Sequence, residues 1–357
     1  MQEAAGSMRG PAGPAALGDL GAFGRIDLAR TIAAVAKRAR AEGHAGSYLD
    51  KVGLRNATVI LDHAGVQTAW RVPEANFELA HFDRRSVLKG AIDIASSRGV
   101  WRLSLLAEDS EARQTVKLKA MVDNLYPESL AEALPGFAAL RMFRLPLDAE
   151  AELALSSTGE VLSGHALLVP AGGEIALPWE GVELPRLEGG RIRVSYERHR
   201  KDFVVEPSTL KWSGSEVVLA GTLSPPDAQG VPDGPSAWGF DLKSVGGALS
   251  PSAGRRGVER LDKWAAKGKL HPAAGLIELD EVTMAAGGGT ATMRGRIFTD
   301  ARAGYDLKGE LATMPASSLL LYWPTFLAPA PRAYFAAGLR AGDVKGGQFH
   351  ATYRSYP

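Results

Sequence analysis

Apolar and polar residues alternate with a period of two along most of the chain. The first alternating segments are 54–61, 70–79 and 88–94, and turn-forming residues separate them at 62–65 and 83–86. Alternation over short segments bounded by turn residues is typical of antiparallel strands. We therefore predict a mainly β fold that begins near residue 52.

The alternating pattern recurs near 190–223 and 268–297 and starts again at 346. Recurrence at this scale indicates a stacked array of similar units. In each of the first three copies, the closing strand carries a glycine between two apolar residues: Leu88-x-Gly90-x-Ile92, Leu219-x-Gly221-x-Leu223 and Met293-x-Gly295-x-Ile297. The predicted division is a disordered segment 1–23, β-repeat units 24–140, 141–257 and 258–345, and the start of a truncated fourth unit 346–357.

Short helices are predicted at proline-bounded corners between the strands. One begins at Pro127, a similar one follows Pro315, and the next has Pro329 and Pro331 at its head. Proline is tolerated in the first turn of a helix and breaks its interior, so these helices are expected to be short. A strand is expected to follow the last helix, opened by the glycine pair at 346–347.

Helical spacing predicts two further helices. Val258, Leu261 and Trp264 are three residues apart, which places a helix at 258–267. Segment 26–41 also has helical spacing and ends in basic residues, which suit the last turn of a helix. That segment is either a helix packed on the protein surface or one that contacts a membrane.

A unit of three or four strands is too small to bury its apolar face alone, so neighbouring units must stack. The sheet then either folds over into a sandwich or curls into a trough that is apolar inside. A trough open along its length would suit acyl chains. The alternation by itself leaves both arrangements open.

Composition narrows the functional classes. The 357 residues include 41 basic and 40 acidic side chains, and this balance gives no electrostatic case for a nucleic-acid partner. The absence of cysteine excludes disulfides, thiolate metal sites and cysteine nucleophiles. No signal peptide is expected at the N-terminus, and prolines and Arg332 interrupt the most apolar region, 319–339.

Catalytic motifs are missing from the sequence. The seven histidines show no metal-ligand spacing, and neither HExxH nor GxSxG occurs. The triple glycine 287–289 is not followed by the Lys-Ser/Thr pair of a phosphate-binding loop. The tryptophans lie mostly on predicted strands or corners, where core packing is expected. We therefore predict a protein that is not an enzyme and has no cofactor or metal site.

A basic cluster lies on the hairpin predicted near 191–203. It comprises Arg191, Arg193, Arg198, His199, Arg200 and Lys201. One interpretation is a solvated sheet edge that discourages pairing with other strands. The other is contact with lipid headgroups or with an anionic glycolipid.

The C-terminal region resembles the AsmA-like superfamily, most closely its YhdP-type branch. In that branch, a corner of the form WP-x-F-L-A-P-x-x-R-x-W precedes a strand opened by two glycines. The chain matches this pattern at Trp323, Pro324, Phe326, Pro329, Arg332, Gly346 and Gly347, and it has Tyr334 where the family usually has tryptophan. Segments 25–79 and 261–284 are similar to strand-entry patterns of the same family, so the resemblance extends from about residue 23 onward.

This resemblance implies an extended, twisted, half-open groove of repeating antiparallel strands, with a few short helices at its corners. Members of the family are anchored in the bacterial inner membrane by an N-terminal helix and extend through the periplasm. They are thought to carry phospholipid toward the outer membrane, without catalytic residues or cofactors. The anchor and the rest of the groove are expected to lie outside this chain, and outer-membrane or periplasmic proteins are further candidate partners.

Two functional hypotheses follow. In the first, the chain is a segment of a periplasmic groove that binds and conducts phospholipid acyl chains between the two membranes. In the second, it is a structural scaffold of the cell envelope with a closed β core. The candidate groove residues are the alternating apolar ones of the repeats: Leu88, Ile92, Val217, Leu219, Leu223, Ala291, Met293 and Ile297.

Overall fold

The computed structural model describes most of the chain from residue 51 to residue 354. It leaves out 1–50, 64–65, 83–84, 111–114, 134–139, 157–159, 177–185, 227–236, 251–257, 300–302, 324–326, 339–340 and 355–357. The predicted disordered segment 1–23 and the predicted helix 26–41 lie outside the described residues.

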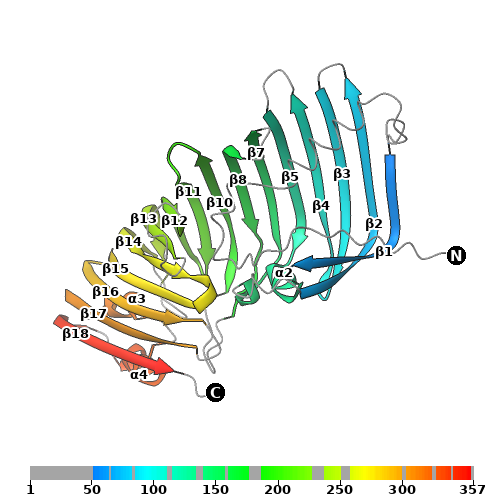
Figure 1. The fold of residues 1–357 in the computed structure, drawn as a ribbon. Coiled ribbons are helices and arrows are strands. Elements are labelled where there is room, and N and C mark those ends of the chain that lie inside the picture. The colour runs from blue at the N-terminus through cyan, green and yellow to red at the C-terminus, as the bar shows by residue number, and fades with distance from the viewer. Residues whose placement is uncertain are drawn as a thin grey trace. The chain divides into compact units, whose positions relative to one another are not determined.

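The fold is mainly β, as predicted, with a few short helices at its corners (Figure 1). Within the described residues, sixteen strands form one antiparallel sheet that is not closed. Their order is β1-β2-β3-β4-β5-β7-β8-β10-β11-β12-β13-β14-β15-β16-β17-β18. Neighbouring strands of this sheet follow one another in the sequence. The β5–β7 connection contains α2 and β6, the β8–β10 connection contains β9, and the β17–β18 connection contains the helices η6, α3 and α4.

The structure divides into two compact units. The first comprises residues 1–141 and 146–167, and the second comprises 142–145 and 168–357. The elements of the first unit are β1 (Lys51–His63), β2 (Val66–Phe82), β3 (Arg85–Ser96), β4 (Gly99–Ser110), β5 (Thr115–Leu125), α2 (Pro127–Ala133), β7 (Leu147–Ser156) and most of β8 (Val161–Pro170).

The second unit contains the remaining elements. Its strands are β10 (Leu187–Glu197), β11 (Phe203–Trp212), β12 (Ser215–Ser224), β13 (Trp238–Leu249), β14 (Glu259–His271), β15 (Leu276–Ala286), β16 (Gly289–Phe298), β17 (Gly304–Pro315) and β18 (Asp343–Arg354). A separate two-stranded sheet pairs β6 (Phe143–Arg144) with β9 (Glu174–Ile175). The helices are η5 (Pro272–Ala274), η6 (Ala316–Ser318), α3 (Leu319–Tyr322) and α4 (Pro329–Gly338).

Strand register gives the first unit two chemically different faces. Residues directly opposite each other in antiparallel strands project to the same face. Phe77 lies opposite Gly90, and Leu103 lies opposite both Ile92 and Val122. These positions form the apolar face of the first unit. The positions between them are mostly polar or charged and form its polar face.

The second unit is two-faced in the same way. Gly221 lies opposite Val205 on one side and Leu242 on the other. Farther along the sheet, Met293 lies opposite Val282 and Gly309. These positions belong to the apolar face of the second unit, and the positions between them carry most of its charged side chains.

The helix predicted at 258–267 is wrong, because this segment belongs to strand β14. Leu261 pairs with Ala286 and Trp264 pairs with Met284. A register shift after Leu261 adds one residue to β14, so Leu261 and Trp264 reach the same apolar cluster although they are three residues apart. A β-bulge therefore produced the spacing that resembled a helix.

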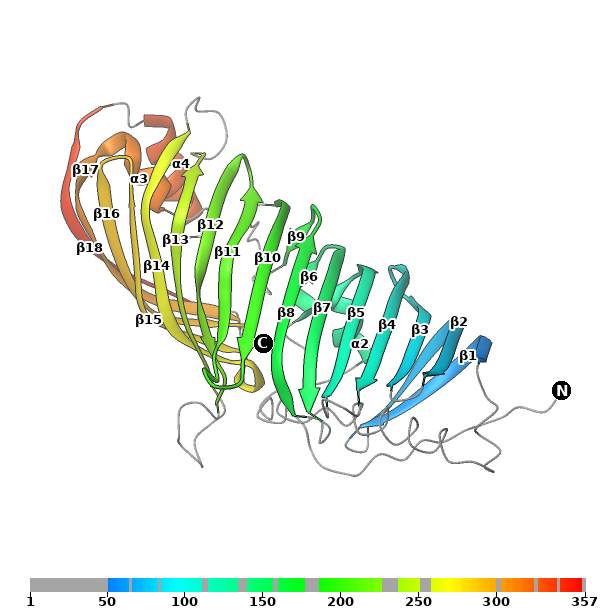
Figure 2. The same cartoon turned by 90° about the horizontal axis from the view of Figure 1, so that it is seen from above.

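The repeated glycine serves two different purposes. Gly221 and Gly295 have φ values of 159° and 145°, and a Cβ at either position would lie 2.0 Å from a carbonyl oxygen of the next strand. Each faces a register shift in the preceding strand, β11 or β15. Bulges bend strands, and Figure 2 shows that β14 to β17 bend along their length. Gly90 instead leaves room for a ring, because its Cβ would lie 2.7 Å from Phe77.

The predicted proline-bounded helices are confirmed, and they occupy equivalent positions in the two units. Helix α2 follows β5 and contacts the β3–β4 turn, where Arg98 forms an ion pair with Glu128. Helix α3 follows β17 and contacts the β15–β16 turn, where the Ser318 hydroxyl donates to the Gly287 carbonyl at 2.6 Å. Each helix thus folds back past the strand that it follows and reaches the turn between the two strands before that one. The predicted C-terminal strand is also confirmed, as β18.

Candidate functional site

All eight predicted groove residues lie on the apolar faces. Leu88 and Ile92 belong to the first unit, where Leu88 lies opposite Leu79 and Ile92 opposite Leu103. The other six belong to the second unit: Val217, Leu219, Leu223, Ala291, Met293 and Ile297. Val217 is buried, and the other seven are half-buried. The apolar faces therefore keep accessible hydrocarbon surface on the strands.

The structure brings some of these residues together and separates others. Ile92 packs against the cluster around Val72 and Trp101 in the first unit. In the second unit, Val217 and Leu219 share one cluster, whereas Met293 and Ile297 belong to another. The eight residues thus mark separate stretches of apolar surface, with two in the first unit and six in the second.

The sequence analysis missed many residues of the apolar faces. Val52 and Leu54 of β1 lie opposite Phe77 and Ala75, and each is 42 % exposed. In the second unit an aromatic row joins Tyr196 to Phe203 at 5.0 Å and Phe203 to Trp238 at 5.7 Å, measured between ring centroids. Alternation marks such residues as possible strand positions, but only the register shows that they share one face.

The helical corners pack on the same faces as the candidate residues. In the first unit, Leu130 of α2 contacts the cluster around Trp101. In the second unit, Leu321 and Tyr322 contact the cluster that contains Leu219, and Leu327 contacts the one that contains Met293. The corners therefore cover part of each apolar face at one end of the strands.

Hydrogen bonds from Tyr322 and Arg332 hold the C-terminal helical corner, the region that resembles the AsmA-like superfamily, and we call this set of bonds the anchor. The Tyr322 hydroxyl accepts from the Ala286 amide at 2.6 Å and lies within donating distance of the carbonyl oxygens of Ala286 and Gly289. Burial raises the pKa of this phenol. The Arg332 guanidinium donates to the carbonyl oxygens of Trp323, at 2.7 Å, and Leu320.

Helix α4 lies over this anchor and buries none of its residues. Partial burial of the Arg332 guanidinium, which remains half-exposed, lowers the pKa of that group. The ring of Phe335 stacks on Trp323 at 5.5 Å, whereas Tyr334 is 78 % exposed. Arg332 and Trp323 therefore stabilise the corner, while Tyr334 makes little packing contact.

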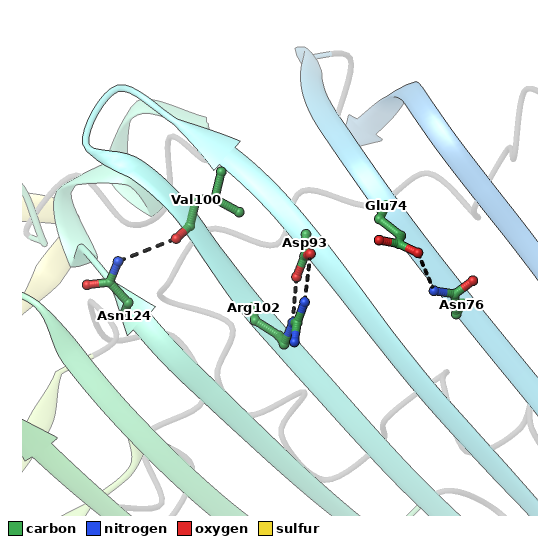
Figure 3. Close-up of polar contacts among 6 residues, drawn as sticks. All are labelled: Glu74, Asn76, Asp93, Val100, Arg102 and Asn124. Carbon is green, nitrogen blue, oxygen red and sulfur yellow. Dashed lines mark hydrogen bonds and ion pairs between the residues drawn. The ribbon is translucent and has the colours of Figure 1, made fainter.

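The polar faces carry ladders of charged side chains instead of a site. Arg102 binds Asp93 with two hydrogen bonds, of 2.6 and 2.8 Å, and this interaction lowers the pKa of the Asp93 carboxyl (Figure 3). Lys119 contacts Glu150 and Glu152 on the next strand. Such exposed pairs contribute little to stability. They keep these faces solvated and leave the apolar faces as the distinctive surface.

The polar face of the first unit is hollowed between charged rows. A depression of about 650 Å³ is lined there by small residues such as Gly53 and Ala91, with Lys51, Lys89 and Lys119 among its neighbours. Lys51 forms an ion pair with Glu78 at 3.4 Å, and Lys119 is paired as described above. Two of the three lysines at the depression are thus paired with carboxylates.

The basic hairpin joins β10 to β11. Its arginines at 191 and 193 and the turn residues 198–201 are exposed. Both strands are interior in the sheet order, so the interpretation of a protected sheet edge is wrong. Contact with lipid headgroups or with an anionic glycolipid stays a prediction.

Three further findings concern function. None of the described helices has the length and apolar character needed to cross a membrane. Within the described residues, no group of three or more acidic or histidine side chains is placed to hold a metal ion. No protein-family model, characterised protein or solved structure matches the chain.

Proposed function

We propose that this protein binds the acyl chains of phospholipid along the apolar faces of its sheet and acts without catalysis. The observation that carries the proposal is the contrast between the two faces of each unit. One face bears charge ladders, whereas the other bears half-buried aliphatic and aromatic side chains, including seven of the eight predicted residues. An accessible apolar surface of this extent is typical of a binding surface.

The driving force would be the transfer of hydrocarbon out of water. Burial of an acyl chain gains about 0.8 kcal/mol for each CH₂ group. Antiparallel strands place apolar side chains at every second position, so within each stretch of apolar surface these side chains adjoin along and across the strands. An acyl chain could therefore lie along such a stretch while the headgroup stays in water.

The resemblance to the AsmA-like superfamily supports a more specific role. In this role the chain is a segment of a periplasmic, inner-membrane-anchored protein that conducts phospholipid toward the outer membrane and supports envelope integrity. The resemblance rests on the corner around Trp323 and on the strand that follows it, and the described residues of this region form α3, α4 and β18. Both the location and the transport direction belong to the proposal.

The test compares two glutamates placed on opposite faces of one strand. Leu219→Glu introduces a carboxylate on the apolar face of β12, and Val218→Glu introduces the same group on the polar face. Native mass spectrometry of each protein after incubation with phosphatidylethanolamine would measure the lipid that stays bound. We expect Leu219→Glu to lower this amount at least roughly tenfold, because a desolvated carboxylate is costly. Val218→Glu should leave it unchanged.

Two results would contradict the proposal. If the wild-type protein is folded and rich in β structure but retains no lipid, the scaffold hypothesis is favoured. If Leu219→Glu unfolds the protein while Val218→Glu does not, Leu219 packs a closed core and does not line a binding surface. Circular dichroism of both variants separates loss of binding from loss of fold.

A further inference from the structure

Two tryptophans on the apolar faces have indole N–H groups without a partner. Among the described residues, the buried side-chain nitrogen and oxygen atoms that lack a hydrogen bond are Trp70 Nε1, Ser129 Oγ and Trp238 Nε1. Trp70 lies opposite Val59 on the apolar face of the first unit, and Ser129 belongs to α2, which packs on that face. In folded proteins most buried polar groups are paired, so such exceptions require an explanation.

Trp238 is the clearer of the two cases. Its ring lies 5.7 Å from that of Phe203, at the end of the aromatic row on β10, β11 and β13. It precedes Phe240 by two residues on β13, and Phe240 lies opposite Leu223, one of the predicted groove residues. The Trp238 N–H is therefore a hydrogen-bond donor set within an apolar surface, next to positions where a lipid chain would lie.

The chemistry of this donor restricts its ligand. An indole N–H donates and cannot accept, so the ligand must supply an acceptor oxygen or nitrogen. A charged phosphate would pay a large desolvation penalty among aromatic and aliphatic side chains, whereas a neutral carbonyl would not. In a glycerophospholipid, neutral carbonyl oxygens occur at the ester linkages, directly beside the acyl chains.

We propose that Trp238 recognises the ester carbonyl of a bound acyl lipid, and that Trp70 does the same in the first unit. The inference rests on the proposed lipid-binding function and deepens it, because it makes the acyl-ester linkage the selected feature. The side chain of each tryptophan is only half-buried. Each ring is therefore partly accessible to a ligand that enters along the face, and the proposed contact requires the ring to turn so that its N–H meets the carbonyl oxygen.

The experiment compares two lipids that differ only at the linkage. Short-chain phosphatidylcholine with ester-linked chains and its ether-linked analogue share headgroup and chain length, but only the ester carries a carbonyl. Titration of each lipid into the full chain, followed by calorimetry, gives the two dissociation constants. We expect the wild-type protein to bind the ester roughly three- to tenfold more tightly, which corresponds to one neutral hydrogen bond.

The variants locate this preference. Trp238→Phe keeps an aromatic ring but removes the donor, so its preference for the ester should fall by about twofold or more while its affinity for the ether is unchanged. Trp212→Phe is the matched control, since Trp212 lies on the same apolar face of the second unit and its nitrogen is not among the buried unpaired atoms. It should keep the wild-type ratio.

The outcomes separate the two levels of the argument. Equal affinity of the wild-type protein for both lipids, or an unchanged ratio in Trp238→Phe, would overturn the role of the indole and leave lipid binding standing. Absence of binding to either lipid would overturn the proposed function and this inference with it. The wild-type comparison needs no variant, so it decides the question even if Trp238→Phe does not fold. A downfield shift of the Trp238 indole proton with the ester alone would support the hydrogen bond directly.

Discussion

The anchor between Tyr322 and the β15–β16 turn gives the most direct test of the structure. Tyr322→Phe removes only the hydroxyl, which contacts the amide and carbonyl of Ala286 and the carbonyl of Gly289 at 2.5 to 2.6 Å. Ala286 is completely buried, so its amide would lose its partner without gaining water. An unsatisfied buried group costs about 1–3 kcal/mol, and we expect the variant to lose that much stability at the corner.

Hydrogen exchange measured by mass spectrometry is the appropriate assay, because the corner can open without unfolding the sheet. Peptides that cover 284–290 and 318–323 should exchange faster in Tyr322→Phe by a factor of roughly 5 to 160, the equivalent of the expected free energy. Tyr334→Phe makes the same chemical change at a side chain that is 78 % exposed, and it should behave like the wild-type protein. Equal exchange in both variants would refute the anchor.

The same hydroxyl gives a pH dependence with a defined sign. Burial raises the pKa of Tyr322 in the folded protein, so the folded state retains its proton where the unfolded chain, with a pKa of about 10, loses it. The stability contributed by the neutral phenol is present below about pH 10 and is lost as pH rises through the folded pKa. Above about pH 10, the free energy of unfolding should therefore fall less steeply with pH in Tyr322→Phe than in the wild-type protein.

Three further predictions concern single features of the fold. Gly295→Ala should lower the free energy of unfolding in urea by about 3 kcal/mol or more, because its Cβ would lie 2.0 Å from the Asp306 carbonyl oxygen and the residue has a positive φ. The control is Gly347→Ala, which has open space around the added carbon and should lower that free energy by less than about 1 kcal/mol. Arg332→Met should release α4, because it removes the hydrogen bonds from Arg332 to the carbonyl oxygens of Leu320 and Trp323. Proteolysis within 329–338 should then be faster. Unchanged cleavage would show that the Trp323–Phe335 contact alone holds this helix. Arg102→Gln should raise the pKa of Asp93 toward its ordinary value, as followed by carboxyl NMR, because the paired guanidinium lowers it in the wild-type protein. The stability from that pair is present at neutral pH and is lost as pH falls through the folded pKa, so Arg102→Gln should lose less stability on acidification than the wild-type protein.

Local pattern in the sequence was enough to predict the class of fold and the positions of the helical corners. A period of two specifies which residues share a face within one strand, and proline limits where a helix can start, so both features follow from neighbours in the chain. This is why Leu219 and Leu223 were correctly paired on one face of β12, and why α2 and α4 begin at Pro127 and Pro329. By contrast, no strand was predicted at the position of β13.

Only the tertiary structure decided what depends on the register between strands. The bulge in β14 brought Leu261 and Trp264 to one face and turned a helical spacing into a strand. The partners of Tyr322 lie at least 33 residues away along the chain, and Phe203 lies 35 residues from Trp238, so no local pattern could reveal these contacts. The sequence by itself determined that each strand has an apolar side. The hydrogen-bonded order of the strands determined that, within each unit, these sides combine into one surface on which the corners and the unpaired indoles lie.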